Sequence, residues 1–84
     1  MIRVCYFASL REQVGLAEEA LEPTPAVADV AGLRAWLRGR GGAWAESLAE
    51  SRPVLCAVNQ VMARPAQAIA DGDEVAFFPP VTGG

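Results

Sequence analysis

The stretch DGDEVAFFPPVTGG (residues 71–84) decides which fold this sequence predicts. Its first three residues, Asp-Gly-Asp, are a strong turn signal. The next five, Glu74–Phe78, form a mostly apolar run of strand length. Pro79 and Pro80 end that run because proline cannot donate a hydrogen bond to a ladder. Since this is the most apolar strand in the sequence, we expect it to lie at the centre of a sheet.

The other expected strands are shorter. Residues 2–7 combine β-branched and aromatic side chains, and residues 54–58 form a second apolar run; both are typical of strands. Asn59 and Gln60 predict a turn into a short return strand at residues 61–62. Residues 17–22 predict an edge strand.

Helical signals lie between these strands. Ser9 followed by Glu12 is a capping-box pattern that predicts the start of a short helix, which Gly15 ends. Asp29 is the expected N-cap of the main helix, and a glycine-rich segment at 39–42 ends it. One or two further helical turns are expected around Trp44 and Leu48. The core-facing stripe of the main helix is expected to contain Val30, Leu33, Trp36 and Leu37.

These elements predict one α+β domain in a chain of 84 residues. One long helix would pack on a mixed sheet of four to five strands, with short extra helices. Parallel pairing of the first and last strands would give the β-grasp arrangement of ubiquitin-like folds. We expect residues 1–78 to form this domain and residues 79–84 to form an extended tail.

Composition argues against several classes of function. The net charge of −3 and the lack of a basic block argue against nucleic acid as a partner, and no apolar run is long enough to span a membrane. The chain has no His, which removes Ser-His-Asp and Cys-His sites. Cys5 and Cys56 lack metal-ligand spacing and are expected to be reduced and buried. With no signal peptide at the N-terminus, we expect a cytoplasmic protein that binds no metal.

The strand pattern predicts which side chains lie on each of the two faces of the sheet. A single helix covers one face only, so the other face should be polar if solvent covers it. The residues expected to face inward are Val4, Tyr6, Cys56, Val58, Val75 and Phe77. The residues expected to face outward are Cys5, Phe7, Leu55, Ala57, Ala76 and Phe78, with Met62 extending them. Because this outward set is apolar, we interpret it as a surface that docks on a partner.

The C-terminal residues suggest a chemical role. Pro79 and Pro80 favour a stiff, extended exit from the sheet, and two glycines without Cβ atoms could enter a narrow channel. A terminal carboxylate is a poor electrophile, but conversion to an acyl-adenylate would supply a leaving group. Sulfur could then replace one oxygen to give a nucleophilic thiocarboxylate. The sequence offers no ATP site, so another protein would have to perform the activation; the alternative is an inert tail.

Three segments resemble the small, sulfur-carrying subunit of molybdopterin synthase. They are residues 71–84, residues 57–60 (Ala-Val-Asn-Gln) and the opening segment 2–7 with the helix that follows. The resemblance implies that Gly84 is adenylated by a partner similar to ubiquitin-activating enzymes, which uses ATP, and is then thiocarboxylated by a sulfur donor protein. This chain would bind no cofactor and would have no independent catalytic site.

The resemblance also implies how the sulfur is delivered. The small subunit would dock on the large subunit in a 2+2 heterotetramer and insert Val81, Thr82 and Gly83 into the active site. There the thiocarboxylate would give its sulfur to cyclic pyranopterin monophosphate. Positions that match the family's partner contacts are Phe7, Met62 and Phe78 and, more loosely, Arg11.

Three other functions remain open at this point. A thiamine-pathway sulfur carrier shares the fold and the Gly-Gly end, although the Phe-Phe-Pro-Pro segment favours the molybdopterin pathway. A ubiquitin-like protein modifier would join its terminus to lysines. A β-grasp interaction module would use its outer face and leave the tail inert.

Overall fold

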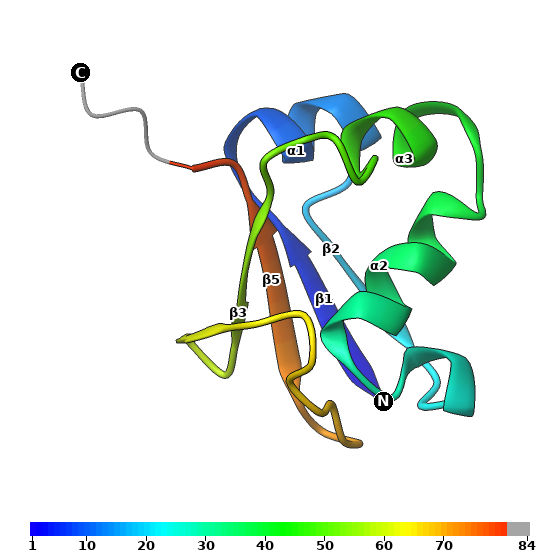
Figure 1. The fold of residues 1–84 in the computed structure, drawn as a ribbon, viewed down its shortest axis with the longest axis vertical. Helices are drawn as coiled ribbons and strands as arrows, with labels where there is room; N and C mark the ends of the chain where they lie inside the picture. Colours follow the sequence, from blue (N-terminus) through cyan, green and yellow to red (C-terminus); the bar gives the residue numbers. More distant parts are fainter. Residues whose placement is uncertain (81–84) are drawn as a thin grey trace.

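The computed structural model describes residues 1–80 and contains a five-stranded sheet with the strand order β2-β1-β5-β3-β4 (Figure 1). The central strand β5 pairs in parallel with β1 and antiparallel with β3, which confirms both the β-grasp pairing and the central place of the most apolar strand. The edge strand expected from residues 17–22 is also confirmed. The strands are β1 (Ile2–Tyr6), β2 (Glu18–Leu21), β3 (Leu55–Val58), β4 (Val61–Ala63) and β5 (Glu74–Phe78).

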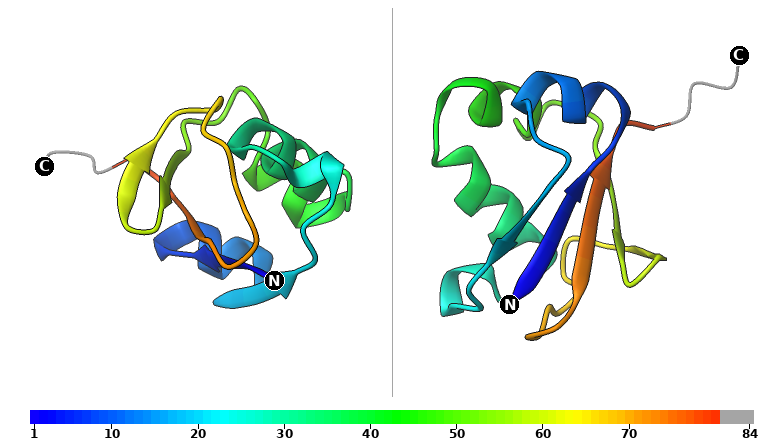
Figure 2. Two further views of the ribbon diagram at one scale, coloured as in Figure 1. Left: turned by 90° about the horizontal axis from the view of Figure 1, so that it is seen from below. Right: turned by 180° about the vertical axis from the view of Figure 1, so that it is seen from behind.

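The helices cover one face of this sheet, which we call the inner face (Figure 2). The main helix α2 begins after Asp29, whose side chain accepts a hydrogen bond of 2.7 Å from the Gly32 amide, and Gly39 caps its other end. Both helix boundaries confirm the sequence prediction. The remaining helical elements are α1 (Ala8–Val14), the 3-10 turn η1 (Pro25–Val27) and α3 (Gly42–Ser47), and α2 itself spans Val30–Arg38.

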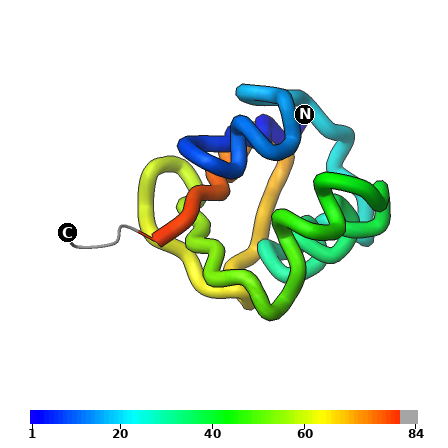
Figure 3. Tube along the Cα trace, turned by 90° about the horizontal axis from the view of Figure 1, so that it is seen from above, coloured from blue at the N-terminus to red at the C-terminus, as the bar shows by residue number. Residues whose placement is uncertain are grey.

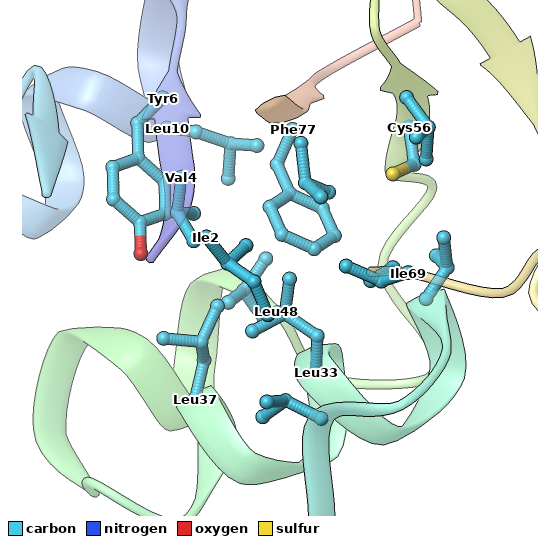
Figure 4. Packing of buried hydrophobic residues seen from close by; sticks show 14 residues of the cluster. Ile2, Val4, Tyr6, Leu10, Leu33, Leu37, Leu48, Cys56, Ile69 and Phe77 are labelled. Carbon is cyan, nitrogen blue, oxygen red and sulfur yellow. The ribbon is translucent and has the colours of Figure 1, made fainter. Parts of the chain in front are cut away.

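The core lies between α2 and the inner face (Figure 4). All six side chains expected to face inward from the strands are buried, and Val30, Leu33 and Leu37 of α2 are buried against them. Leu48, directly after α3, is also fully buried. This agreement follows from strand alternation, which places every second side chain on the same face.

Two local predictions are wrong. The helix α1 begins at Ala8, with Phe7 as an N-cap that makes no side-chain cap bond, so Ser9 lies inside the helix and forms no capping box. The chain passes directly from β1 into the helix through Ala8, whose φ is 54°. Trp36 does not join the core stripe of α2, because 42% of its surface is exposed; the Arg40 guanidinium lies 5.0 Å from its ring centroid.

A polar cluster ties the first two strands to the link between α2 and α3. The Glu19 carboxylate accepts hydrogen bonds from the Tyr6 hydroxyl (2.9 Å) and from both Arg40 terminal nitrogens (2.8 and 2.6 Å). The Arg40 guanidinium also lies 4.5 Å from the centroid of the Trp44 ring. Burial alone would raise the pKa of Glu19, but the hydrogen bonds from Arg40 and Tyr6 outweigh it and lower that pKa.

We expect Glu19→Gln to lower the free energy of unfolding by about 1–3 kcal/mol at neutral pH, because a charged acceptor of three hydrogen bonds is lost. Since folding lowers the pKa of Glu19, its contribution is complete above the unfolded value of roughly 4.3. It is then lost as the pH falls through the lower folded-state pKa. Urea unfolding should therefore show the gap between wild type and variant shrinking in acid. The exposed Glu12→Gln is the matched control; a gap for Glu19→Gln that is constant with pH would contradict this account.

Candidate functional site

The outer face of the sheet divides into a polar end and an apolar end. Strand register places Glu18, Cys5, Ala76, Ala57 and Met62 in one row across the five strands. In the next row toward the end of β5, Phe78 pairs with Leu55. Phe7 lies beside β5 there, since its amide donates a 3.1 Å hydrogen bond to the Phe77 carbonyl.

We define the apolar patch as Phe7, Leu55, Met62, Ala76 and Phe78. Phe7 and Met62 are about half exposed (49% and 59%), Leu55 is 37% exposed, and Ala76 and Phe78 are half-buried. Aromatic and methionine side chains are enriched at protein interfaces, and several on one uncovered face favour a docking surface. The structure thus brings together the three apolar residues that the sequence proposed as partner contacts.

Cys5 and Ala57 lie on the outer face as expected but do not contribute to the patch, because both are buried. The Cys5 sulfur lies 3.9 Å from a Glu18 carboxylate oxygen and 3.8 Å from a Glu74 carboxylate oxygen. Arg3 joins these two carboxylates, at 2.7 and 3.7 Å. Long charged side chains therefore cover the cysteine and make this end of the outer face polar.

Arg11 lies on α1, exposed, one turn beyond Phe7, whose carbonyl accepts the Arg11 amide at 3.4 Å. Its guanidinium can thus be presented at the same end of the molecule as the patch. A role for Arg11 in docking stays a prediction.

The described chain leaves the sheet next to the patch. Phe78 is the last residue of β5, and Pro79 and Pro80 follow it, half-buried. Figure 3 shows this segment at the rim of the molecule, and Figure 1 shows that it leaves the sheet at the end of β5 nearest α1. The expected carrier residues Val81, Thr82, Gly83 and Gly84 lie outside the described residues, so their roles stay predictions.

The two thiols are poorly suited to carry sulfur. Burial raises the pKa of Cys56 to about 11, and burial followed by the Glu74 charge raises the pKa of Cys5. Both side chains are therefore protonated at neutral pH, and the thiolate is the reactive form. Within residues 1–80, no three His, Cys, Asp or Glu side chains gather to hold a metal ion. No helix in this part of the chain is long and apolar enough to cross a membrane.

We expect both cysteines of the native chain to react with iodoacetamide at least about tenfold more slowly than the same cysteines in urea. The unfolded chain is its own control, because it exposes both thiols without changing the sequence. Mass spectrometry of the labelled chain would count the adducts. Rapid labelling of either cysteine under native conditions would contradict the burial seen here.

Sequence reasoning missed one further feature, a cavity of about 440 Å³ between α2 and the β3–β4 hairpin. Its lining includes Arg34 and Arg38, which are four residues apart and therefore share one face of the helix. That spacing was visible in the sequence. The approach of Arg64, from the segment after β4, depends on tertiary structure and was not.

A mixed sheet with one long helix on a single face defines a β-grasp protein of the ubiquitin-like class. Residues 4–84 match the family model described as the ThiS family. The chain belongs to this family. Two curated relatives, from Escherichia coli and Haemophilus influenzae, are 43% and 42% identical over 84 residues, which is all of this chain and all of each relative. Both are named molybdopterin synthase sulfur carrier subunit.

Solved structures agree with this fold. A putative molybdopterin converting factor subunit 1 from Pyrococcus furiosus is 30% identical, with a TM-score of 0.77 over 95% of this chain and 97% of that one. Small archaeal modifier protein 1 of Haloferax volcanii is 25% identical, with a TM-score of 0.75 over the same shares. A Helicobacter pylori complex of subunits 1 and 2 of molybdopterin-converting factor matches at 24% identity and a TM-score of 0.68, over 99% of this chain and 97% of that one; it supports the fold alone.

Proposed function

We propose that this chain is the sulfur carrier of a molybdopterin synthase and that Gly84 carries the sulfur. The observation that supports this most strongly is the 43% identity, over the whole length of both chains, to a relative with that name. The geometry is consistent with it, since the strand leading to the C-terminal residues also carries Phe78 of the apolar patch. The chain would act in catalysis only as part of the two-subunit enzyme.

The proposed chemistry takes place at the Gly84 carboxylate in three steps. First, a carboxylate oxygen attacks the α-phosphate of ATP in an activating partner, which forms the acyl-adenylate and releases pyrophosphate. Next, hydrosulfide supplied by a donor protein attacks the acyl carbon, displaces AMP and leaves a thiocarboxylate. In the large subunit the thiocarboxylate sulfur then attacks a carbon of cyclic pyranopterin monophosphate and displaces an oxygen substituent from it, and hydrolysis of the resulting acyl–sulfur bond returns Gly84 to a carboxylate.

The apolar patch supplies the docking surface in this proposal. Phe7, Met62 and Phe78, with Arg11 at the margin, would contact the large subunit in a 2+2 heterotetramer. Val81, Thr82 and Gly83 would reach into its active site. The activating enzyme needs the same terminus, so we propose that it docks on the same end of the sheet and that the two partners bind in turn.

Intact mass spectrometry tests this function directly. The purified chain would be incubated with ATP, its activating enzyme and a sulfur donor, and its intact mass would then be measured. We expect the mass change of one sulfur-for-oxygen exchange, located at the C-terminal peptide, and no change when ATP is left out. A chain that gains no sulfur with an active enzyme and donor would refute the carrier role.

A protein modifier is the second candidate, and the structural likeness to the archaeal modifier protein favours considering it. A modifier would form isopeptide bonds between Gly84 and lysines of other proteins. Digestion of cell extract followed by detection of branched peptides would reveal such bonds. Isopeptide bonds that form in the presence of the large subunit would support the modifier function. Isopeptide bonds that form only in its absence would leave sulfur transfer as the main function.

A further inference from the structure

The cavity between α2 and the β3–β4 hairpin has the size and lining of a binding groove. Its volume of about 440 Å³ lies within the range typical of ligand sites. Apolar side chains form its floor, including Val30 from α2, Val54 before β3 and Phe77 from β5. Figure 4 shows Phe77 and Cys56 on neighbouring strands at this side of the core.

The charge at this groove is opposite to that of the whole chain. The net charge of the protein is −3, yet Arg34, Arg38 and Arg64, three of its seven basic residues, line the groove. Glu50 is the one acidic residue in the lining. It meets Arg38 at 3.5 Å with a side chain that is 86% exposed, so this pair is weak and can be exchanged for another carboxylate.

Arg34 is held in place for binding. Its Nε and Nη2 atoms donate to the carbonyls of Leu48, Ala49 and Arg52 at 2.9, 2.6 and 3.0 Å, which fixes the guanidinium and leaves Nη1 to donate elsewhere. Burial, and then the nearby Arg38 charge, lower the pKa of Arg34. Two cations held close together beside an apolar floor favour an anion between them.

The groove is also open to an extended polypeptide. The strand β4 is the edge of the sheet, so an extended segment can reach the groove past this edge. Ala63 of β4 lines the groove, and Leu55 lines it while also belonging to the apolar patch. Leu55 is therefore the residue that the patch and the groove share.

We propose that this groove is a second docking site, which binds an extended segment of a protein partner that carries aliphatic side chains followed by acidic ones. The aliphatic side chains pack over Val30, Val54 and Phe77, and the carboxylates reach Arg34 and Arg38. The site is separate from the carrier chemistry, because no step at Gly84 involves these residues.

The test uses the full chain, labelled with ¹⁵N, and a synthetic peptide, acetyl-Leu-Thr-Leu-Thr-Glu-Glu-amide, whose alternate residues place leucines and a glutamate on one face. We expect titration to shift the amides of Ala31, Ala35 and Ala63 with a dissociation constant on the order of 0.1 mM. The amides of Glu12 and Ala20, which are exposed and do not line the groove, should stay in place. A control peptide with Gln-Gln at its end should bind about tenfold more weakly.

Two matched pairs of variants locate the site. Ala35→Leu fills the mouth of the groove and should weaken binding at least about fivefold, whereas Ala20→Leu adds the same bulk to an exposed position of β2 and should not. Arg38→Gln should weaken binding about fivefold, whereas Arg3→Gln at the polar end of the outer face should not. The proposal is wrong if millimolar peptide leaves the groove amides unshifted, if the Gln-Gln peptide binds equally well, or if Arg38→Gln has no effect.

Discussion

Deletion of Gly84 should abolish sulfur transfer without changing the stability of the domain. The deletion moves the terminal carboxylate back by about 3.5 Å along an extended chain. Since a misplacement of only about 1 Å can reduce catalysis about 100-fold, we expect activity to fall by at least that factor. Molybdopterin formation with the large subunit, together with intact mass after activation, would measure both stages of the reaction.

Gly84→Ala is the matched control for the deletion, because it keeps the chain length and the carboxylate and adds one methyl group. We expect it to impair activation less than the deletion does. The melting temperatures of both variants should stay within about 2 °C of wild type, since every core residue found in residues 1–80 lies at or before Phe77. Wild-type activity after the deletion would show that sulfur transfer does not depend on Gly84. A large loss of stability would show that the end of the chain contributes to the fold.

Phe78→Arg should weaken binding to the large subunit by at least about 30-fold, the effect of losing an aromatic residue that dominates an interface. Phe78 lies beside Leu55 and Phe7 at the centre of the patch, so a charge there would be buried on docking without a partner. The side chain is only half-buried in the free chain, and we expect the free energy of unfolding to change by about 1 kcal/mol or less. Isothermal titration calorimetry against the large subunit would measure the affinity.

Leu16→Arg is the control for this substitution. Leu16 is an exposed apolar residue (38%) that follows α1 and lies outside the patch, so the same charge there should leave the affinity unchanged. Equal affinity of Phe78→Arg and Leu16→Arg for the large subunit would show that the patch is not the docking surface.

The sequence predicted those features that depend on strong local signals or on simple alternation. The run Glu74–Phe78 has the composition of a buried strand, and it forms one. Asp29 and Gly39 set the two ends of α2 through hydrogen bonds to residues only a few positions away. Strand alternation then assigned each side chain to a face. The outward position of Phe7 and Phe78 followed directly from that alternation.

The features that sequence reasoning missed depend on contacts between distant segments. Trp36 has the spacing of a core residue, but Arg40 stacks on it at the surface. The burial of Cys5 requires Glu18 and Glu74, which come from strands on either side of it. The groove needs α2 and the β3–β4 hairpin to stand apart, a separation that no local pattern describes.

Under the proposed function, the position of Phe78 at the end of β5 sets a maximum distance between the docking surface and the terminal carboxylate. Six residues follow it in the sequence, and even fully extended they span no more than about 20–22 Å. Any enzyme that binds Phe78 and also acts on Gly84 must have its reactive centre within that distance of its Phe78-binding site. Different partners that bind Phe78 and act on Gly84 would therefore share one distance between these two sites. An inserted residue would misplace the carried sulfur in all of them.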